Sequence, residues 1–279
     1  MPLPSPRLWA IRAAFRTVGA VAPGVAARWA ETLFCTPPRR RAGDEAFVAT
    51  GTPFSVTSQG QQLAAWQWGE GPVVVLVHGW GSRASRMSDL ARALVAAGFR
   101  VVAFDAPAHG ASTGRFASLP EFARALADVA ESVRSIYGLV GHSLGGAAVA
   151  MAMRHGLAPR RVVLLAPPAD VRIFSDIFAQ TLAISSAVQE TMHRNLERRL
   201  QMVWDDLHIP TVVRALPAAA LIIHDRDDKD VPYTHGEEIV GAWAGSRLET
   251  TSGLGHRALP RDPAVIGRAV EFLREGLAE

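Results

Sequence analysis

Five short runs of almost purely apolar residues recur along the chain and limit its fold more than any other feature. They are VVVLVHG (73–79), RVVAFD (100–105), YGLVGH (137–142), RVVLLAP (161–167) and AALIIHD (219–225). A strand that is apolar throughout must be covered on both faces, as the strands of parallel sheets are. Segments of helical character follow the runs, at about 84–97, 118–135, 144–156, 234–244 and 263–277. We therefore expect an α/β fold with a mostly parallel, doubly covered sheet.

Three weaker runs extend the predicted sheet. FSVTS (54–58) and LAAWQW (63–68) are separated by a short segment that contains Gly60, as in an antiparallel pair. RLETTS (247–252) has the composition of a last strand, ahead of the last helix. The sheet is thus predicted to begin with an antiparallel pair and to continue with parallel strands.

One interval breaks the alternation of strands and helices. About 50 residues separate Ala166 from Ala219, far more than one crossover needs. Apolar residues recur within it at helical spacing, which predicts two or three amphipathic helices that form a small cap: Ile173, Phe174, Ile177, Phe178, Val188, Met192, Leu196, Leu200, Val203 and Leu207. The predicted organisation is an N-terminal helical extension (1–46), a core (47–168 and 217–279) and the cap (169–216).

The N-terminal region is basic and amphipathic. Residues 1–41 contain seven arginines and one acidic residue, although the whole chain has a net charge of only +3. Arg12 and Arg16 interrupt the apolar stretch that a secretory signal would need. The stripe formed by Leu8, Ile11, Phe15, Val18 and Ala22 predicts a helix that packs on the body of the protein, with a membrane surface or a dimer partner as alternative contacts.

Composition excludes several classes of protein. The chain has 279 residues, 49% of them hydrophobic, but no run of 18 apolar residues, so no membrane span is expected. A single cysteine, Cys35, excludes a disulfide framework and favours a cytoplasmic location. The nine histidines show no metal-ligand spacing, and no basic patch with interleaved aromatic residues follows the N-terminal region. We expect no metal, no cofactor and no nucleic-acid partner; the sequence predicts no oligomeric state.

Residues directly after the strands are the candidates for chemistry, because ligands of such sheets bind at the carboxyl ends of the strands. One interpretation is a dinucleotide site, since HGWGSRA (78–84) fits GxGxxA and Asp105 ends the next strand. The other joins Ser143 of GHSLG, the acidic cluster of HDRDDKDVPY (224–233) and His256 of GLGHRAL. The second interpretation is favoured, because two strands precede the glycine motif, whereas the dinucleotide fingerprint usually occupies the first βαβ unit.

These segments resemble the α/β-hydrolase fold family from residue 47 to the end of the chain. GHSLG fits its GxSxG nucleophile motif, and FDAPAHGAS (104–112) its DxPGHGxS stretch, with Ala108 where glycine is usual. The HGW and IHDxDDxxVP segments are similar to those of a bacterial subgroup of uncharacterised serine hydrolases. The resemblance implies a Ser–Asp–His triad in that chain order.

The resemblance also implies the role of each residue. Ser143 is the nucleophile and His256 the general base and then acid, while the backbone N–H groups of Trp80 and Leu144 form the oxyanion hole. Gly141 and Gly145 leave room for the strained turn that projects the serine. His78 and two aromatic residues of the cap, Phe174 and Phe178, are the candidate pocket residues. His78, His109 and His142 are also candidates for supporting the surrounding loops.

The acid is chosen among neighbouring aspartates: Asp225, Asp227, Asp228 and Asp230. The family pattern GxxDxxVP places Asp228 at the acid position and Asp225 where glycine is usual. This departure leaves an assignment to Asp225 or Asp227 open. Asp170 follows an earlier strand, where some lipases carry the acid, but we expect it to cap the first helix of the insertion.

A serine nucleophile implies an acyl-enzyme, and hydrolysis of small carboxylic esters (EC 3.1.1) is the expected reaction. The apolar cap favours uncharged esters with short to medium acyl chains. An acyltransferase, a thioesterase or a C–C bond hydrolase with the same triad is the alternative, and a dinucleotide-binding protein is the weaker one.

Overall fold

The computed structural model describes residues 5–38 and 44–277. It divides into two compact units. One contains Met1–Thr36 and Asp170–His208, and the other contains Pro37–Ala169 and Ile209–Glu279. The N-terminal extension up to Thr36 and most of the predicted insertion therefore belong to the same unit, a grouping that the sequence did not predict.

The second unit is built on one eight-stranded sheet in the order β1-β2-β4-β3-β5-β6-β7-β8. The strands are β1 (Thr52–Ser58), β2 (Gln61–Trp68), β3 (Val73–Val77), β4 (Arg100–Phe104), β5 (Ile136–His142), β6 (Arg161–Leu165), β7 (Ala219–Asp225) and β8 (Ser246–Thr251). β2 pairs antiparallel with both β1 and β4, and the remaining neighbours are parallel. This arrangement confirms the predicted mostly parallel sheet with an antiparallel start.

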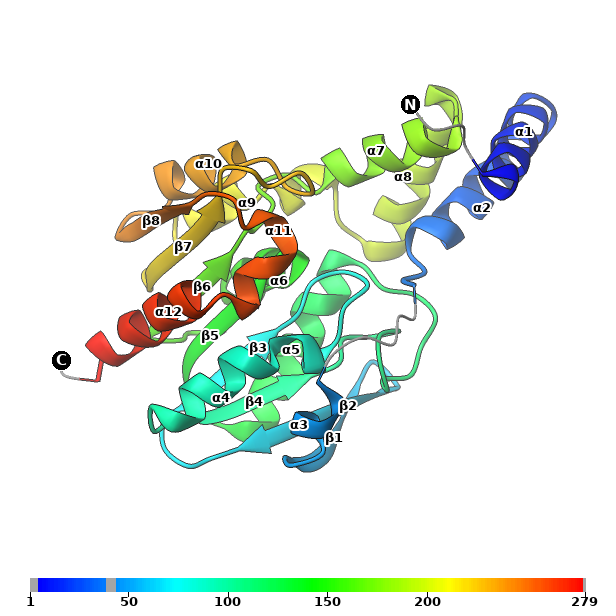
Figure 1. Ribbon diagram of the computed structural model, residues 1–279. Coiled ribbons are helices and arrows are strands. Elements are labelled where there is room, and N and C mark those ends of the chain that lie inside the picture. Colours follow the sequence, from blue (N-terminus) through cyan, green and yellow to red (C-terminus); the bar gives the residue numbers. More distant parts are fainter. Residues whose placement is uncertain (1–4, 39–43, 278–279) are drawn as a thin grey trace. The chain divides into compact units, whose positions relative to one another are not determined.

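Helices cover both faces of this sheet (Figure 1). α4 (Ser88–Ala96) and α12 (Pro263–Glu275) pack on one face, where they share a buried apolar cluster with alternate residues of the central strands. α5 (Leu119–Val133) and α6 (Leu144–Arg154) lie together on the other face, next to α9 (Ile209–Val213) and α10 (Thr234–Ala242). β3 and β6 are buried at every position, which explains their unbroken apolar sequence.

Short helices fill the connections of the second unit: α3 (Glu45–Val48), η1 (Ala84–Met87), α11 (Gly255–Ala258) and η3 (Leu259–Arg261). α9 also belongs to this unit, because it packs against α6 and α10. The insertion therefore ends at His208 in the structure, rather than at residue 216 as the sequence suggested.

The first unit is helical. It contains α1 (Pro6–Val21), α2 (Pro23–Phe34), α7 (Arg172–Leu182), α8 (Ser186–Leu200) and η2 (Trp204–Leu207). Proline at the start of α2 separates it from α1, and the rings of Phe15 and Trp29 then stack at 4.1 Å between the two helices. α2 also packs closely on α8. In the described part of the chain, every helix is too short or too polar to cross a membrane.

Candidate functional site

Ser143 lies at the turn between β5 and α6, with backbone angles φ 55° and ψ −127°. A positive φ is costly for a residue with a side chain and marks a strained turn. The glycines on either side make this turn sterically possible. A Cβ atom on Gly141 would lie 2.6 Å from the carbonyl oxygen of Gly145, and one on Gly145 only 2.3 Å from that of Val77. The half-buried Ser143 is thereby held out of the sheet at the carboxyl end of its strand.

The loop after β3 approaches this serine closely. A Cβ atom on Gly79 would lie 2.9 Å from Ser143 Cβ and 3.4 Å from Ser143 Oγ. No side chain fits there without moving the serine or the loop. The sequence HGW therefore needs glycine at its second position to bring the next peptide group, that of Trp80, beside the serine turn.

Two histidines hold this loop in place. Nδ1 of His78 donates to the Gly79 carbonyl oxygen at 2.7 Å, and its Nε2 accepts the Ala106 N–H at 3.0 Å. His109 acts in the same way, because its Nδ1 donates to the Pro107 carbonyl at 2.8 Å and its Nε2 accepts the Gly81 N–H at 3.0 Å. His78 is only 1% exposed and both of its ring nitrogens are bonded in this region, so it supports the loop, while its role in a pocket stays a prediction.

Two backbone donors remain open beside Ser143. Leu144 is the first residue of α6, and the first N–H groups of a helix have no partner within the helix. Across the described ranges, neither the Leu144 N–H nor the Trp80 N–H donates to another protein group. The positive end of the α6 dipole adds to the attraction for negative charge at this point. The arrangement can stabilise an oxyanion.

Gly79→Ala is expected to lower kcat/KM by about 10²-fold, because the new methyl group displaces Ser143 or the Trp80 N–H from its position. Gly267→Ala is the matched control, since a Cβ atom there meets nothing within 4 Å and the residue lies in α12. Steady-state kinetics with a chromogenic ester measures both. Equal rates for the two variants would contradict the close approach of Gly79 to Ser143.

The side chains of His256 and Asp228 meet beyond the carboxyl ends of β8 and β7. His256 Nδ1 and Asp228 Oδ2 are 2.7 Å apart, and the aspartate side chain is fully buried. The other carboxylate oxygen, Oδ1, accepts the backbone N–H groups of Asp230 and Val231, both at 2.8 Å. Burial acts to raise the pKa of Asp228, but hydrogen bonds from His224, His256 and the Val231 N–H outweigh it and bring the pKa well below its usual range. Asp228 is therefore an anion that is aimed at His256.

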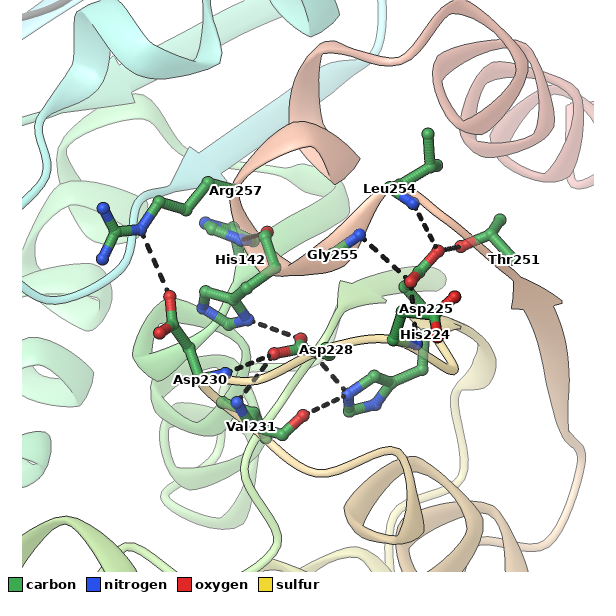
Figure 2. A network of polar contacts seen from close by, with 12 residues as sticks. His142, His224, Asp225, Asp228, Asp230, Val231, Thr251, Leu254, Gly255 and Arg257 are labelled. Carbon is green, nitrogen blue, oxygen red and sulfur yellow. Dashed lines mark hydrogen bonds and ion pairs between the residues drawn. The ribbon is translucent and has the colours of Figure 1, made fainter. Parts of the chain in front are cut away.

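Asp225 has a different task. Its carboxylate accepts the Thr251 hydroxyl at 2.7 Å and the Leu254 and Gly255 N–H groups at 3.1 and 3.0 Å (Figure 2). These bonds fasten the segment that carries His256 to the end of β7. Asp227 accepts the Gly253 N–H at 2.8 Å in the same segment. Of the candidate aspartates, the structure brings Asp228 to the histidine, whereas Asp225 and Asp227 hold the segment that carries it.

His142 connects the serine turn to the histidine. Its Nε2 donates to the His256 carbonyl oxygen at 3.0 Å, and the two imidazole rings lie 4.8 Å apart. Because His142 directly precedes Ser143, this bond fixes the end of β5 relative to α11. Burial, with the nearby His256 as a smaller cause, lowers the pKa of His142 to about 3. His142 thus remains a neutral donor.

The buried histidines predict a pH dependence of stability. Burial lowers the pKa of His78 to about 4 and that of His142 to about 3, from 6.5. Below pH 6.5 the unfolded chain binds protons that the folded chain does not, so the free energy of unfolding should fall by about 1.4 kcal/mol per pH unit for each histidine. Chemical denaturation at pH 7, 6 and 5 measures this slope. A flat profile would contradict the prediction.

Comparison with known proteins identifies the family. The family model for serine aminopeptidases, S33, matches residues 71–227, more than half of the chain. The chain belongs to this family of α/β hydrolases. A non-heme chloroperoxidase of Kitasatospora aureofaciens is 35% identical over 130 residues, which is 44% of this chain and 47% of that protein. The aligned part thus spans about half the length of this curated relative.

Solved structures share the fold of the hydrolase at low sequence identity. An esterase of Pyrococcus furiosus superposes with a TM-score of 0.66 and 18% identity, over 86% of this chain and 98% of the esterase. A meta-cleavage product hydrolase of Pseudomonas fluorescens gives a TM-score of 0.60 and 18% identity, over 80% and 98% of the two chains. These likenesses confirm the α/β-hydrolase fold.

The structure gives the dinucleotide interpretation no support. Asp105 is 3% exposed, and its two carboxylate oxygens accept the Ala84 and Ala111 N–H groups, both at 2.7 Å. It therefore fastens two loops of the hydrolase and is not free to bind a ribose. The glycine loop is also followed by a 3₁₀ turn rather than directly by an α-helix, so it lacks the helix N-terminus that would hold a pyrophosphate.

The predicted pocket residues of the cap lie on α7, in the helical unit. Phe178 is half-buried and its ring lies 5.3 Å from that of Phe34. Phe174 is also half-buried. Their role in an acyl pocket stays a prediction. Asp170 accepts the N–H of Arg172, the first residue of α7, and pairs with its guanidinium at 2.9 Å, so it is committed to the start of that helix.

Sequence reasoning missed three functional details of the hydrolase. His256 lies in the one-turn helix α11 rather than in a loop, since the glycines around it suggested no helix. The loop-fastening role of Asp225 was not predicted, although its departure from the glycine of the family pattern was a signal. His224, expected only to end its strand, lies beside Asp228.

Proposed function

We propose that this hydrolase cleaves carboxylic esters through an acyl-enzyme formed on Ser143. His256 takes the proton of the serine hydroxyl as the oxygen attacks the ester carbonyl carbon. The carbonyl oxygen becomes an oxyanion that accepts the N–H groups of Trp80 and Leu144. Collapse of this intermediate breaks the ester C–O bond, and His256 returns the proton to the departing alcohol.

A water molecule then attacks the acyl-enzyme through the same kind of steps. His256 removes one proton from the water, whose oxygen attacks the acyl carbonyl carbon. The second tetrahedral intermediate again places its charge in the oxyanion hole. Its collapse releases the carboxylic acid and restores the hydroxyl of Ser143 with the proton that His256 carried. Asp228 keeps Nδ1 of His256 protonated, so that Nε2 is free to accept, and stabilises the imidazolium in both halves of the reaction.

The observation that carries the proposal is the bond of 2.7 Å between His256 Nδ1 and Asp228 Oδ2, in a histidine whose backbone is bonded to the residue before the strained turn of Ser143. If Ser143 only began helix α6, the glycines around it would still be explained. That role would not require a histidine oriented by an aspartate. The bond from His142 to the His256 backbone ties that base to the serine turn. Base, acid and open donors are together the parts that acyl transfer needs.

A fluorophosphonate probe followed by peptide mapping tests the nucleophile, and a substrate panel tests the reaction. The panel contains p-nitrophenyl esters of graded acyl length, acyl thioesters, aminoacyl p-nitroanilides and a meta-cleavage C–C substrate. We expect a label on Ser143 and the highest kcat/KM with uncharged, short to medium acyl esters. A label on another serine would overturn the mechanism. A preference for the thioester, the anilide or the C–C substrate would leave the mechanism in place but show that the substrate is not a carboxylic ester.

A further inference from the structure

Behind the candidate acid lies a second histidine, His224, at the end of β7. It is completely buried. Its Nε2 donates to the Val231 carbonyl oxygen at 3.0 Å and lies 3.5 Å from Asp228 Oδ2, the same oxygen that faces His256 (Figure 2). Because a carbonyl oxygen can only accept, Nε2 must carry a hydrogen atom. Asp228 thus lies between two imidazoles.

The position of the His224 ring is determined from several sides. Its Nδ1 has no hydrogen-bond partner in the described ranges, and it faces Gly236, where a Cβ atom would lie 2.7 Å from it. The ring of Tyr233 meets it edge-on, with the centroids 5.8 Å apart. A buried polar nitrogen without a partner costs free energy, and hydrophobic residues of similar size would avoid that cost. The chain nevertheless has histidine there, which points to a use for Nε2.

We infer that His224 is a positioning residue, which holds Asp228 in line with His256. The inference rests on the proposed function. Val231 completes the connection, because its N–H donates to Asp228 Oδ1 while its carbonyl accepts from His224. The turn that carries Asp228 is therefore tied to β7 through His224. The two backbone N–H groups that donate to Oδ1 belong to the same turn, so without this tie the turn can shift and carry the carboxylate away from His256 Nδ1.

The test compares three substitutions at this position. His224→Gln keeps an N–H donor at about the reach of Nε2, His224→Asn keeps an amide but is too short, and His224→Leu removes the donor. We expect His224→Leu and His224→Asn to lower kcat about tenfold with KM little changed, and His224→Gln to stay within about threefold of the wild type. Thermal unfolding verifies that each variant is folded. A uniform loss in all three, or none in any, would overturn the inference.

A second measurement does not depend on turnover. His256 Nδ1 lies 2.7 Å from Asp228 Oδ2, so the hydrogen atom between them should give a low-field proton NMR signal. A displaced Asp228 carboxylate no longer accepts this hydrogen bond, so the signal should be lost in His224→Leu and return in His224→Gln. An unchanged signal in His224→Leu would refute the positioning role.

Asp228→Asn separates the two proposals. If Asp228→Asn leaves the rate of fluorophosphonate labelling unchanged, the proposed mechanism fails, whatever His224 does. If Asp228→Asn slows labelling and His224→Leu does not, the mechanism stands and only the role of His224 is lost. Both variants should slow labelling, Asp228→Asn the more.

Discussion

Ser143→Ala is expected to abolish ester turnover, with kcat lower by at least about 10⁴-fold, and to remove fluorophosphonate labelling. The substitution deletes the only atom placed to form the acyl-enzyme at the turn between β5 and α6. Alanine keeps the Cβ atom that packs near Gly79, so the fold should be retained. Turnover of p-nitrophenyl acetate and mass spectrometry of the labelled protein measure the two effects.

The helical unit supplies a matched control for this experiment. Ser175 Oγ lies 2.6 Å from His193 Nε2, so this pair imitates a nucleophile and its base. Ser175 is completely buried, however, and burial also lowers the pKa of His193. Ser175→Ala should therefore keep both labelling and turnover. If Ser143→Ala kept residual activity and the double variant with Ser175→Ala lost it, Ser175 and not Ser143 would be the nucleophile.

Much of the fold could be predicted from the sequence, because burial on both faces imposes a continuous apolar composition on parallel strands. That constraint located β3 to β7 to within a few residues. Pro23, which separates α1 from α2, is an equally local signal, although only the first of these two helices was predicted. The grouping of the N-terminal helices with the insertion was not predictable in this way, since it depends on contacts such as those of α2 with α8.

The candidate site was predictable where a steric requirement fixes the residue type at a single position. Gly141 and Gly145 flank Ser143 because any side chain would overlap backbone atoms, and such a requirement is visible in the sequence. The different roles of the neighbouring aspartates could not be predicted from the sequence. Asp225 and Asp228 are both buried acidic residues of one turn, and only their hydrogen-bond partners distinguish them.

Those partners make Asp228→Asn the most informative substitution after Ser143→Ala, with an expected loss in kcat of more than tenfold and up to about 10⁴-fold. Oδ1 of Asp228 accepts two backbone N–H groups, so the amide oxygen of asparagine must take its place. The amide NH₂ group is then forced to face His256 Nδ1, which must become an acceptor. The hydrogen moves to Nε2, and the histidine can no longer take the serine proton.

Asp225→Asn is the control, because Asp225 is also a buried acidic residue and ends β7, just before the turn that carries Asp228. Its carboxylate contacts the Thr251 hydroxyl and backbone N–H groups of the His256 segment, and no side chain of the proposed triad. Loss of one or two of these bonds should cost about 1–3 kcal/mol of stability, while kcat falls far less than in Asp228→Asn. Steady-state kinetics and thermal unfolding of both variants separate the two roles. If Asp225→Asn lost its activity and Asp228→Asn kept it, Asp225 would be the acid of the triad. Only the acid of the triad controls which nitrogen of His256 carries the hydrogen.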